Sequence, residues 1–200
     1  MSQDAITLFT ARRTQYALGR KLPMPEAEVE ALIRQAIRLA PSSFNSQSSR
    51  ALILFGAASE KLWKQITKEI LRPLVPADAF ASTDAKLDAF AAGAGTVLFY
   101  EDQDTIAELQ KKYPLYADNF PVFSEHSSGM AQFAVWTALA GAGIGASLQH
   151  YAPLIDDEVA RTWDVPASWK LRAQMPFGSN EKPFAEKSFI ADEGRFKTVR

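Results

Sequence analysis

The sequence predicts a layered α/β or α+β fold, and three observations support that prediction. Four short apolar runs have the length and composition of buried strands. Segments with apolar residues at helical spacing separate these runs along the chain. The chain has 200 residues, of which 47% are hydrophobic, and it contains no internal repeat. We therefore expect a single domain, residues 1–200, in which helices cover a sheet and enclose a full core.

Helices in the N-terminal half are indicated by apolar spacing, capping residues and proline. Residues 4–18 carry apolar side chains at helical spacing. Pro25 is suited to open a second helix, whose apolar face repeats as far as Ala40. Ser59 is the expected N-cap of a third helix, and the alanine-rich residues 77–94 are expected to form a fourth.

Two of the predicted strands, residues 51–55 and 96–100, are uninterrupted apolar runs, which is typical of strands buried on both faces. Acidic residues from Glu101 to Asp104 follow the second run. They are suited to the positive end of a helix dipole, and this interpretation is simpler than a metal site. A helix through Lys112 is therefore expected after this strand.

The C-terminal half contains the longest helical pattern, residues 123–143. This pattern is apolar on nearly all sides, so we expect a buried core helix that could also line a dimer interface. The glycine-rich run of residues 143–148 leads into a third strand, which is expected to end at residues 149–151. A short helix over 156–163 and a fourth strand over 170–177 complete the predicted core. The tail from Gly178 is polar, and we expect it to be extended.

Composition excludes several classes of function. The net charge of −1 argues against general nucleic-acid binding, which needs a basic surface. Cysteine is absent, which excludes disulfides, thiolate catalysis and cysteine metal sites and is compatible with a reducing cytoplasm. The N-terminal residues lack the pattern of a signal peptide, and no apolar run is long enough to cross a bilayer. We therefore expect a cytoplasmic protein that binds neither nucleic acid nor membrane.

The loop between Ala40 and Arg50 is the most distinctive segment of the chain. It holds serine, asparagine and glutamine side chains and no acid. These neutral donors and acceptors are suited to the polar edge of a planar ligand, and binding residues collect on loops held by a rigid scaffold. The alternative is an ordinary polar connection whose serine and asparagine residues form caps and turns.

Other kinds of active site find little support in the sequence. There is no Gly-x-Ser-x-Gly elbow for a nucleophilic serine, and no glycine-rich phosphate loop. A metal site built from Glu125, His126 and His150 would lack the usual i,i+4 ligand spacing. A structural or pocket-lining role is more common for such histidines, so we expect no metal.

Four segments, in their order along the chain, resemble the nitroreductase family of flavin enzymes. They are Arg12-Arg13-Thr14, Pro41-Ser42-Ser43-Phe44-Asn45-Ser46-Gln47, Gly143-Ile144-Gly145 and Lys187. The family has an early Arg-x-Ser/Thr, a Pro-Ser-Ser/Ala-x-Asn-x-Gln loop, a Gly-Leu/Ile-Gly after the core helix, and a late basic residue. Longer runs, such as Ser-Ser-Phe-Asn-Ser-Gln-Ser-Ser-Arg and Glu-His-Ser-Ser-Gly-Met, are similar to its short, fungal-type branch, which also has bacterial members.

The resemblance implies an α+β fold with a central, mainly antiparallel sheet flanked by helices, in an intertwined homodimer. It also implies two FMN sites at the dimer interface, each built from both subunits. The flavin carries the hydride, so no catalytic side chain is expected, and His126 and Tyr151 are candidates for the slot that the substrate enters. The implied cofactor-binding residues are Arg12, Arg13, Thr14, Tyr16, Ser42, Ser43, Asn45, Gln47, Leu148, Gln149, His150 and Lys187.

Each implied residue has a chemical role. Arg12 and Lys187 would neutralise the FMN phosphate through charge-assisted hydrogen bonds. A backbone amide of residues 149–150 would donate to flavin N5 and tune hydride acceptance. Ser42 and Ser43 would reach the flavin from the neighbouring subunit. The side chains expected at the pyrimidine edge and the ribityl hydroxyls are Arg13, Thr14, Asn45 and Gln47.

This chain departs from the better-known nitroreductases at three places. Those enzymes have Gln-Pro-Trp where this chain has Gln47-Ser48-Ser49, and a Lys or Arg where it has Tyr16. Without that cation, Arg13 would have to stabilise the anionic reduced flavin alone. The Pro-x-x-Gly that usually lies near N5 is replaced by residues 148–151, which are therefore carried over by position only.

The activity that the resemblance implies is a ping-pong oxidoreduction. NADH or NADPH would reduce the flavin and leave, and a nitroaromatic, quinone or similar acceptor would then be reduced in the same slot. The alternative is a sensor or flavin-holding protein that binds FMN but has little turnover. A third hypothesis is an interaction module without a cofactor.

Overall fold

A computed structural model describes residues 4–200, so residues 1–3 of the predicted domain lie outside the described residues. Its sheet has the strand order β1-β5-β3-β2, and β4 pairs with β5 away from this path. Every ladder between these strands is antiparallel, which confirms the predicted sheet. The strands are β1 (Leu18–Gly19), β2 (Ser49–Phe55), β3 (Gly95–Asp102), β4 (Gly145–Ala146) and β5 (Trp169–Asn180).

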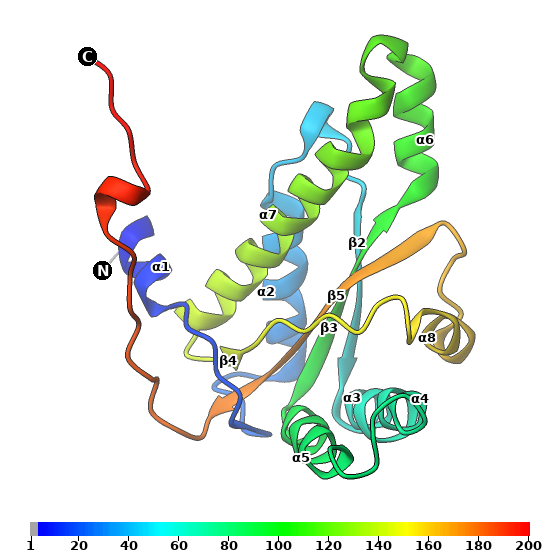
Figure 1. Ribbon diagram of the computed structural model, residues 1–200, viewed down its shortest axis with the longest axis vertical. Coiled ribbons are helices and arrows are strands. Elements are labelled where there is room, and N and C mark those ends of the chain that lie inside the picture. The colour runs from blue at the N-terminus through cyan, green and yellow to red at the C-terminus, as the bar shows by residue number, and fades with distance from the viewer. Residues whose placement is uncertain (1–3) are drawn as a thin grey trace.

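Helices cover both faces of the sheet (Figure 1). One face packs against α2 and the long α7, and the other against α4, α5 and α8 with the π-helical turn before α4. Among the described residues, no helix has both the length and the apolar composition that a membrane span requires. The helices are α1 (Ala5–Ala11), α2 (Glu26–Leu39), α3 (Gly56–Lys61), α4 (Lys68–Leu71), α5 (Phe80–Ala91), α6 (Gln103–Lys112), α7 (Phe120–Gly141) and α8 (Asp156–Trp163).

The core divides at β3, whose side chains alternate between the two faces. Val97 and Phe99 pack with α2 and α7, whereas Leu98 and Tyr100 pack on the opposite side. All eight residues of β3 are buried, which confirms the predicted buried strand. A strand buried on both faces must satisfy its backbone within the sheet, and β3 does so by pairing with β2 and β5.

Two predicted elements differ at the N-terminal end. The helix predicted over residues 4–18 is shorter, because Arg12 is extended and the chain then pairs with the sheet edge. There the Gln15 N–H donates to the Ala146 carbonyl at 2.9 Å.

The prediction that residues 51–55 are fully buried is wrong, because β2 ends the strand order and only Leu54 within it is buried. Apolar composition does not reveal whether a strand has one neighbour or two.

The predicted N-cap at Ser59 is also wrong. The helix α3 begins at Gly56, and Ser59 lies inside it, buried against the sheet. The Ser59 hydroxyl lies 2.7 Å from the Thr96 hydroxyl, to which the Trp63 indole N–H also donates at 2.9 Å. A buried hydroxyl needs such a partner, and its sequence position alone could not distinguish this role from capping.

The third predicted strand is shorter than expected, and α7 is less buried than expected. Regular pairing is confined to β4, but the chain continues beside β5 as far as Gln149, whose N–H donates to the Gln174 carbonyl at 2.7 Å. On α7, Val135 and Leu139 are buried, whereas Met130 and Phe133 are 37% and 41% exposed. This helix therefore presents a second apolar stripe to its surroundings.

Replacing Gly178 by alanine is expected to destabilise the fold. A Cβ at this position would collide with the backbone oxygen of Gly19 and would lie 3.0 Å from the backbone nitrogen of Ala94. Because these neighbours are backbone atoms, β1 would have to move away from β5, at about 1–3 kcal/mol. Urea unfolding measures the loss, and Gly194→Ala, which has no neighbour within 4 Å, is the control. Equal stability of the two variants would show that β1 does not depend on the absence of a side chain at Gly178.

Candidate functional site

The first group of predicted site residues lies where α1 ends beside α7. The guanidinium carbon of Arg12 lies 4.5 Å from the centroid of the Trp136 ring. The indole Nε1 of Trp136 is buried and has no hydrogen-bond partner within residues 4–200. Buried donors are nearly always paired in folded proteins, so this one marks a place for an acceptor. An anionic acceptor fits best, because the arginine beside it supplies positive charge and further donors.

Thr14 continues this group onto the sheet edge. It forms an isolated parallel bridge with Ala146, which places the segment after Arg12 beside the start of the 146–151 segment. Within that segment the backbone of Gln149 pairs with Gln174 in both directions, at 2.7 and 2.9 Å. Alternate residues of an extended chain face opposite ways, so the N–H of His150 faces away from β5. It has no hydrogen-bond partner in the part of the chain that the structure describes.

The C-terminal tail meets the same group (Figure 1). The guanidinium of Arg13 donates to the Ala185 carbonyl, and the Gln15 amide donates to the Lys182 carbonyl at 2.7 Å. Lys187 follows two residues after Ala185 and is exposed, with its Nζ 5.0 Å from the centroid of the Phe189 ring. These contacts bring the tail to Arg13, whereas no contact joins Lys187 to Arg12 within the described residues.

The second group is the loop of residues 42–47, beside the N-terminal half of α7. Its start is fixed by the Ser43 N–H, which donates to the Ser127 hydroxyl at 3.3 Å. Three residues of this loop, none of them glycine, have a positive φ, namely Phe44 at 57°, Asn45 at 49° and Gln47 at 49°. Such conformations are strained and persist only where the surroundings impose them. The side chains of Asn45 and Gln47 are exposed and accessible to a ligand.

Two acidic residues of β3 fix the end of this loop. Glu101 is fully buried and accepts hydrogen bonds from the hydroxyls of Ser48 and Ser49, at 2.6 and 2.5 Å. Asp102 accepts from Arg50 at 2.8 Å, and the same guanidinium donates to the Gln47 carbonyl. The sequence predicts that both acids lie at a helix start, but only Asp102 caps α6. The serine pair in place of Pro-Trp marks a departure at this point of the sequence, but it does not identify Glu101, which lies 53 and 52 positions away, as its partner.

The two groups lie on opposite sides of α7 within one chain. Arg12 contacts this helix at Trp136, and Ser43 contacts it at Ser127. These helix positions are nine residues apart, which is about two and a half turns and about 14 Å along the axis. The structure of a single chain therefore does not bring the loop and the arginines together.

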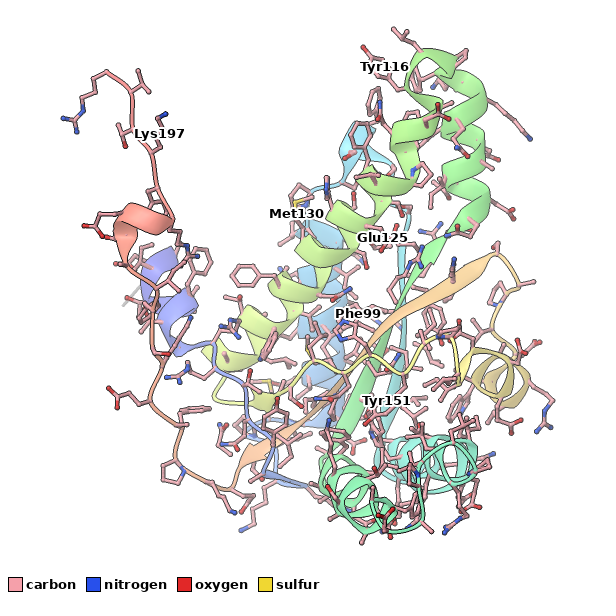
Figure 2. The ribbon with its side chains drawn as sticks, in the orientation of Figure 1. Phe99, Tyr116, Glu125, Met130, Tyr151 and Lys197 are labelled. Atoms are coloured by element: carbon pink, nitrogen blue, oxygen red, sulfur yellow. The ribbon has the colours of Figure 1, made fainter. Side chains whose placement is uncertain are left out.

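The remaining candidates lie in different surroundings. His126 is exposed on α7, and Tyr16 is 57% exposed. The ring of Tyr151 packs edge-on against Trp63, 5.7 Å between centroids, on the side of the sheet where α3 and α5 lie (Figure 2). Burial raises the pKa of the Tyr151 phenol. Glu125 forms an ion pair with Arg172, and residues 4–200 contain no cluster of three or more His, Cys, Asp or Glu that could hold a metal.

An aromatic cluster stands beside the loop. The Phe44 ring lies 5.0 Å from that of Tyr113, 5.2 Å from that of Phe120 and 6.0 Å from that of Tyr116, measured between centroids. Tyr116 marks this end of the molecule in Figure 2. Tilted aromatic pairs of this kind hold the rings in place against one another. The cluster therefore forms an aromatic wall along one side of the loop.

Comparison with known proteins identifies relatives of this chain. Residues 9–179 match the nitroreductase family. The nitroreductase FRM2 of Saccharomyces cerevisiae is 30% identical over 187 residues, with 92% of each chain covered. A structure of nitroreductase CinD from Lactococcus lactis in complex with nicotinic acid is 49% identical, has a TM-score of 0.92, and covers 98% of this chain and 100% of its own.

A more distant structure shows how widely the fold is shared. A nitroreductase with bound FMN from Desulfitobacterium hafniense is 13% identical to this chain, with a TM-score of 0.72 and full coverage of both chains. At that identity the likeness concerns the fold alone. The arrangement of helices around an antiparallel sheet is thus one that accommodates FMN in another protein.

Acid is expected to weaken the attachment of the loop through Asp102. Burial raises the pKa of this carboxyl, but hydrogen bonds from Thr105 and Ser168 and the charge of Arg50 outweigh it and hold the pKa below its usual value. A lowered folded-state pKa stabilises the fold above the ordinary value of about 4, and this stabilisation is lost as the pH falls through the folded-state pKa. Asp102→Asn should therefore lose about 1–3 kcal/mol at pH 7 and have a flatter acid profile. Unfolding measured from pH 7 to pH 3 tests this, and parallel profiles would contradict it.

Proposed function

Because the chain belongs to the nitroreductase family, we propose that it is an FMN-dependent NAD(P)H oxidoreductase that reduces nitroaromatics, quinones or similar acceptors. The family makes it a flavin-dependent oxidoreductase, and its relatives are those of a fungal-type branch with bacterial members. The observation that carries the proposal is the Trp136 Nε1 beside Arg12, which has no hydrogen-bond partner among the described residues. In addition, the 49% identical CinD has been solved in complex with 4-nitrophenol and with chloramphenicol.

The arginine group is suited to the phosphate of FMN. Arg12 supplies a half-buried guanidinium, and the Trp136 indole supplies a donor that has no acceptor in the described part of the chain. Charge-assisted hydrogen bonds of this kind are among the strongest that a protein offers to a phosphate. Lys187 would add a second cation once the tail folds over the ligand, because its neighbour Ala185 is already held by Arg13.

His150, rather than Gln149, is the residue whose backbone amide would donate to flavin N5. The Gln149 N–H is engaged with Gln174, whereas the His150 N–H has no partner within residues 4–200 and faces away from β5. FMN supplies the hydride acceptance at N5 when it is bound. A hydrogen bond to this atom would orient the ring and tune its acceptance of hydride, which is the contribution that this chain would make to the chemistry.

Each site would be built from two copies of the chain. The loop and the arginine group lie on opposite sides of α7, so a ligand that touches both needs the loop of a second copy. A cavity of about 470 Å³ runs between α1, α2 and α7, and it is lined almost entirely by apolar side chains. Phe9, Leu39, Met130 and Phe133 are exposed along it, and burying them against a second copy favours a homodimer.

The tail would make this homodimer intertwined. All residues from Glu181 to Arg200 are exposed, although five of them are large and apolar. The strand β2 ends the sheet within the described residues, and exposed strand edges pair readily with another extended segment. The tail of one subunit is therefore a suitable occupant of the β2 edge of the other. The five apolar residues are Phe184, Phe189, Ile190, Phe196 and Val199.

The proposed cycle is ping-pong and requires no acid–base pair from the protein. The donor and the acceptor would use the same slot in turn, beside the aromatic wall around Phe44 and near the exposed His126. This chain's residues would bind and orient the cofactor and exclude water from the ring. Dependence on NADPH or NADH is in keeping with a cytoplasmic protein.

A flavin-holding or sensing protein is the second candidate, and Tyr16 favours it. This side chain is largely exposed and stands where better-known members carry a cation. A weaker positive field near the pyrimidine edge would make reduction of the flavin less favourable. The visible spectrum of the purified protein, followed by NADPH without oxygen, separates the two candidates. A yellow protein that bleaches supports the reductase, one that stays yellow supports the flavin holder, and a colourless protein that ignores added FMN overturns both.

Arg12→Ala is expected to weaken FMN binding more than folding. Loss of one charge-assisted phosphate contact should raise the FMN dissociation constant by about 10- to 100-fold, since such a hydrogen bond contributes about 1.5–3 kcal/mol. Fluorescence titration of the FMN-free protein measures this constant. Arg161→Ala, which removes an exposed arginine paired with Glu158 on α8, is the matched control and should bind FMN normally. Unchanged affinity in Arg12→Ala would refute the phosphate assignment.

Removal of residues 188–200 is expected to weaken the dimer. Four of the five exposed apolar side chains of the tail would be lost, and each buried one contributes about 1.5–3 kcal/mol. The dimer dissociation constant, measured by analytical ultracentrifugation over a range of concentrations, should rise by more than about tenfold. Lys197→Ala, which changes an exposed charge on the same segment (Figure 2), serves as the control. A truncated chain that dimerises as tightly as the full chain would show that the tail does not cover β2.

A further inference from the structure

Glu101 occupies an unusual environment at the carboxyl end of β3. It is 0% exposed, and its two carboxyl oxygens accept three hydrogen bonds from serine hydroxyls. Ser48 and Ser124 donate to Oε2 at 2.6 and 2.7 Å, and Ser49 donates to Oε1 at 2.5 Å. Within residues 4–200 no lysine, arginine or histidine lies within ion-pair distance of it. Hydroxyl donors alone therefore satisfy this buried group, which would otherwise be costly to remove from water.

These bonds join three elements at one point. Ser48 and Ser49 lie where the 42–47 loop enters β2, Ser124 lies on α7, and Glu101 lies on β3. Ser127, one turn beyond Ser124, accepts the N–H of Ser43 at the start of the same loop. Both ends of the loop are thus fixed to adjacent turns of α7. The start of the loop bonds directly to Ser127, and its end is joined to Ser124 through the carboxyl group of Glu101.

The loop needs such fixation because its backbone is strained. Phe44, Asn45 and Gln47 have positive φ values, which side-chain-bearing residues adopt only under constraint. If the fixed end were released, these residues would relax to other conformations. A ligand would then have to reorder the loop on binding, and its affinity would fall in proportion to the population of the competent conformation.

We propose that Glu101 is a positioning residue for FMN, and that its carboxyl group holds the loop in the conformation that presents Ser42, Asn45 and Gln47 to the cofactor. The proposal rests on the proposed function, since FMN is the ligand that the loop would meet. Glu101 touches no cofactor in this arrangement and acts through Ser48, Ser49 and the strained backbone. The serine pair that replaces Pro-Trp in this chain supplies two of the three donors that Glu101 requires.

Ser48→Ala and Ser124→Ala test the proposal, because each removes one hydrogen bond to Glu101 and leaves the carboxyl group in place. The FMN dissociation constant should rise by about tenfold in each, the effect expected for loss of one buried hydrogen bond. Ser124→Thr keeps a hydroxyl and should restore the affinity. Glu101→Ala is less informative, because three buried hydroxyls would lose their partner and the chain could fail to fold.

Ser59→Ala is the matched control for a merely structural role. Its hydroxyl is equally buried and lies 2.7 Å from the Thr96 hydroxyl, on the face of the sheet away from the loop. This variant should lower the unfolding temperature as Ser124→Ala does, yet bind FMN with an unchanged dissociation constant. Amide hydrogen exchange of residues 43–47 in the FMN-free protein should quicken in Ser124→Ala and not in Ser59→Ala.

Two outcomes would overturn the proposal, and they are distinguishable. If Ser48→Ala and Ser124→Ala bind FMN as the unaltered protein does, while their unfolding temperatures fall, Glu101 stabilises the fold without positioning the loop. If the unaltered protein itself binds no FMN, the proposed function fails and positioning for FMN fails with it. The exchange rates of residues 43–47 would still report, in that case, whether Glu101 holds the loop.

Discussion

The central constraint on this structure is the burial of β3 between β2 and β5. Its alternating side chains form the middle of both hydrophobic clusters, so the helices of each face are positioned relative to this one strand. The strand ends in Glu101 and Asp102, which hold the loop beside α7. The strand β3 therefore organises the core and also fixes the strained 42–47 loop at the surface. A change in the packing of β3 would thus alter the position of this loop.

The helix α7 gives the site its second property, a division into two parts. One side of the helix receives Arg12 through Trp136, and the opposite side receives the loop through Ser127. Between them runs a stripe of exposed apolar residues that includes Met130 and Phe133. A single helix thus separates the two groups of candidate residues and offers an apolar contact for the proposed homodimer. In that homodimer, assembly and cofactor binding would be linked, because each would complete the other.

Local signals predicted the elements well where local forces decide them. The helix over 156–163 agrees with α8 because its acidic first turn and apolar spacing are encoded within eight residues. Predictions failed where residues distant in sequence decide the structure. After Arg12 the helix does not continue, because Thr14 and Gln15 pair with Ala146, and the composition of β2 does not reveal that it has only one neighbouring strand within the described residues. Of the site, the polar loop and the arginines could be found from their order along the chain. Glu101 could not, because its partners Ser48 and Ser49 lie 53 and 52 positions away.

The hydrogen-bonded group of Glu101 and its three serines limits the substitutions that these four positions can accept. Replacing either loop serine by the proline or tryptophan of other branches would leave a buried carboxyl short of donors, and replacing the acid first would leave hydroxyls without an acceptor. Every single step away from this arrangement is unfavourable, so these four positions should change together or not at all.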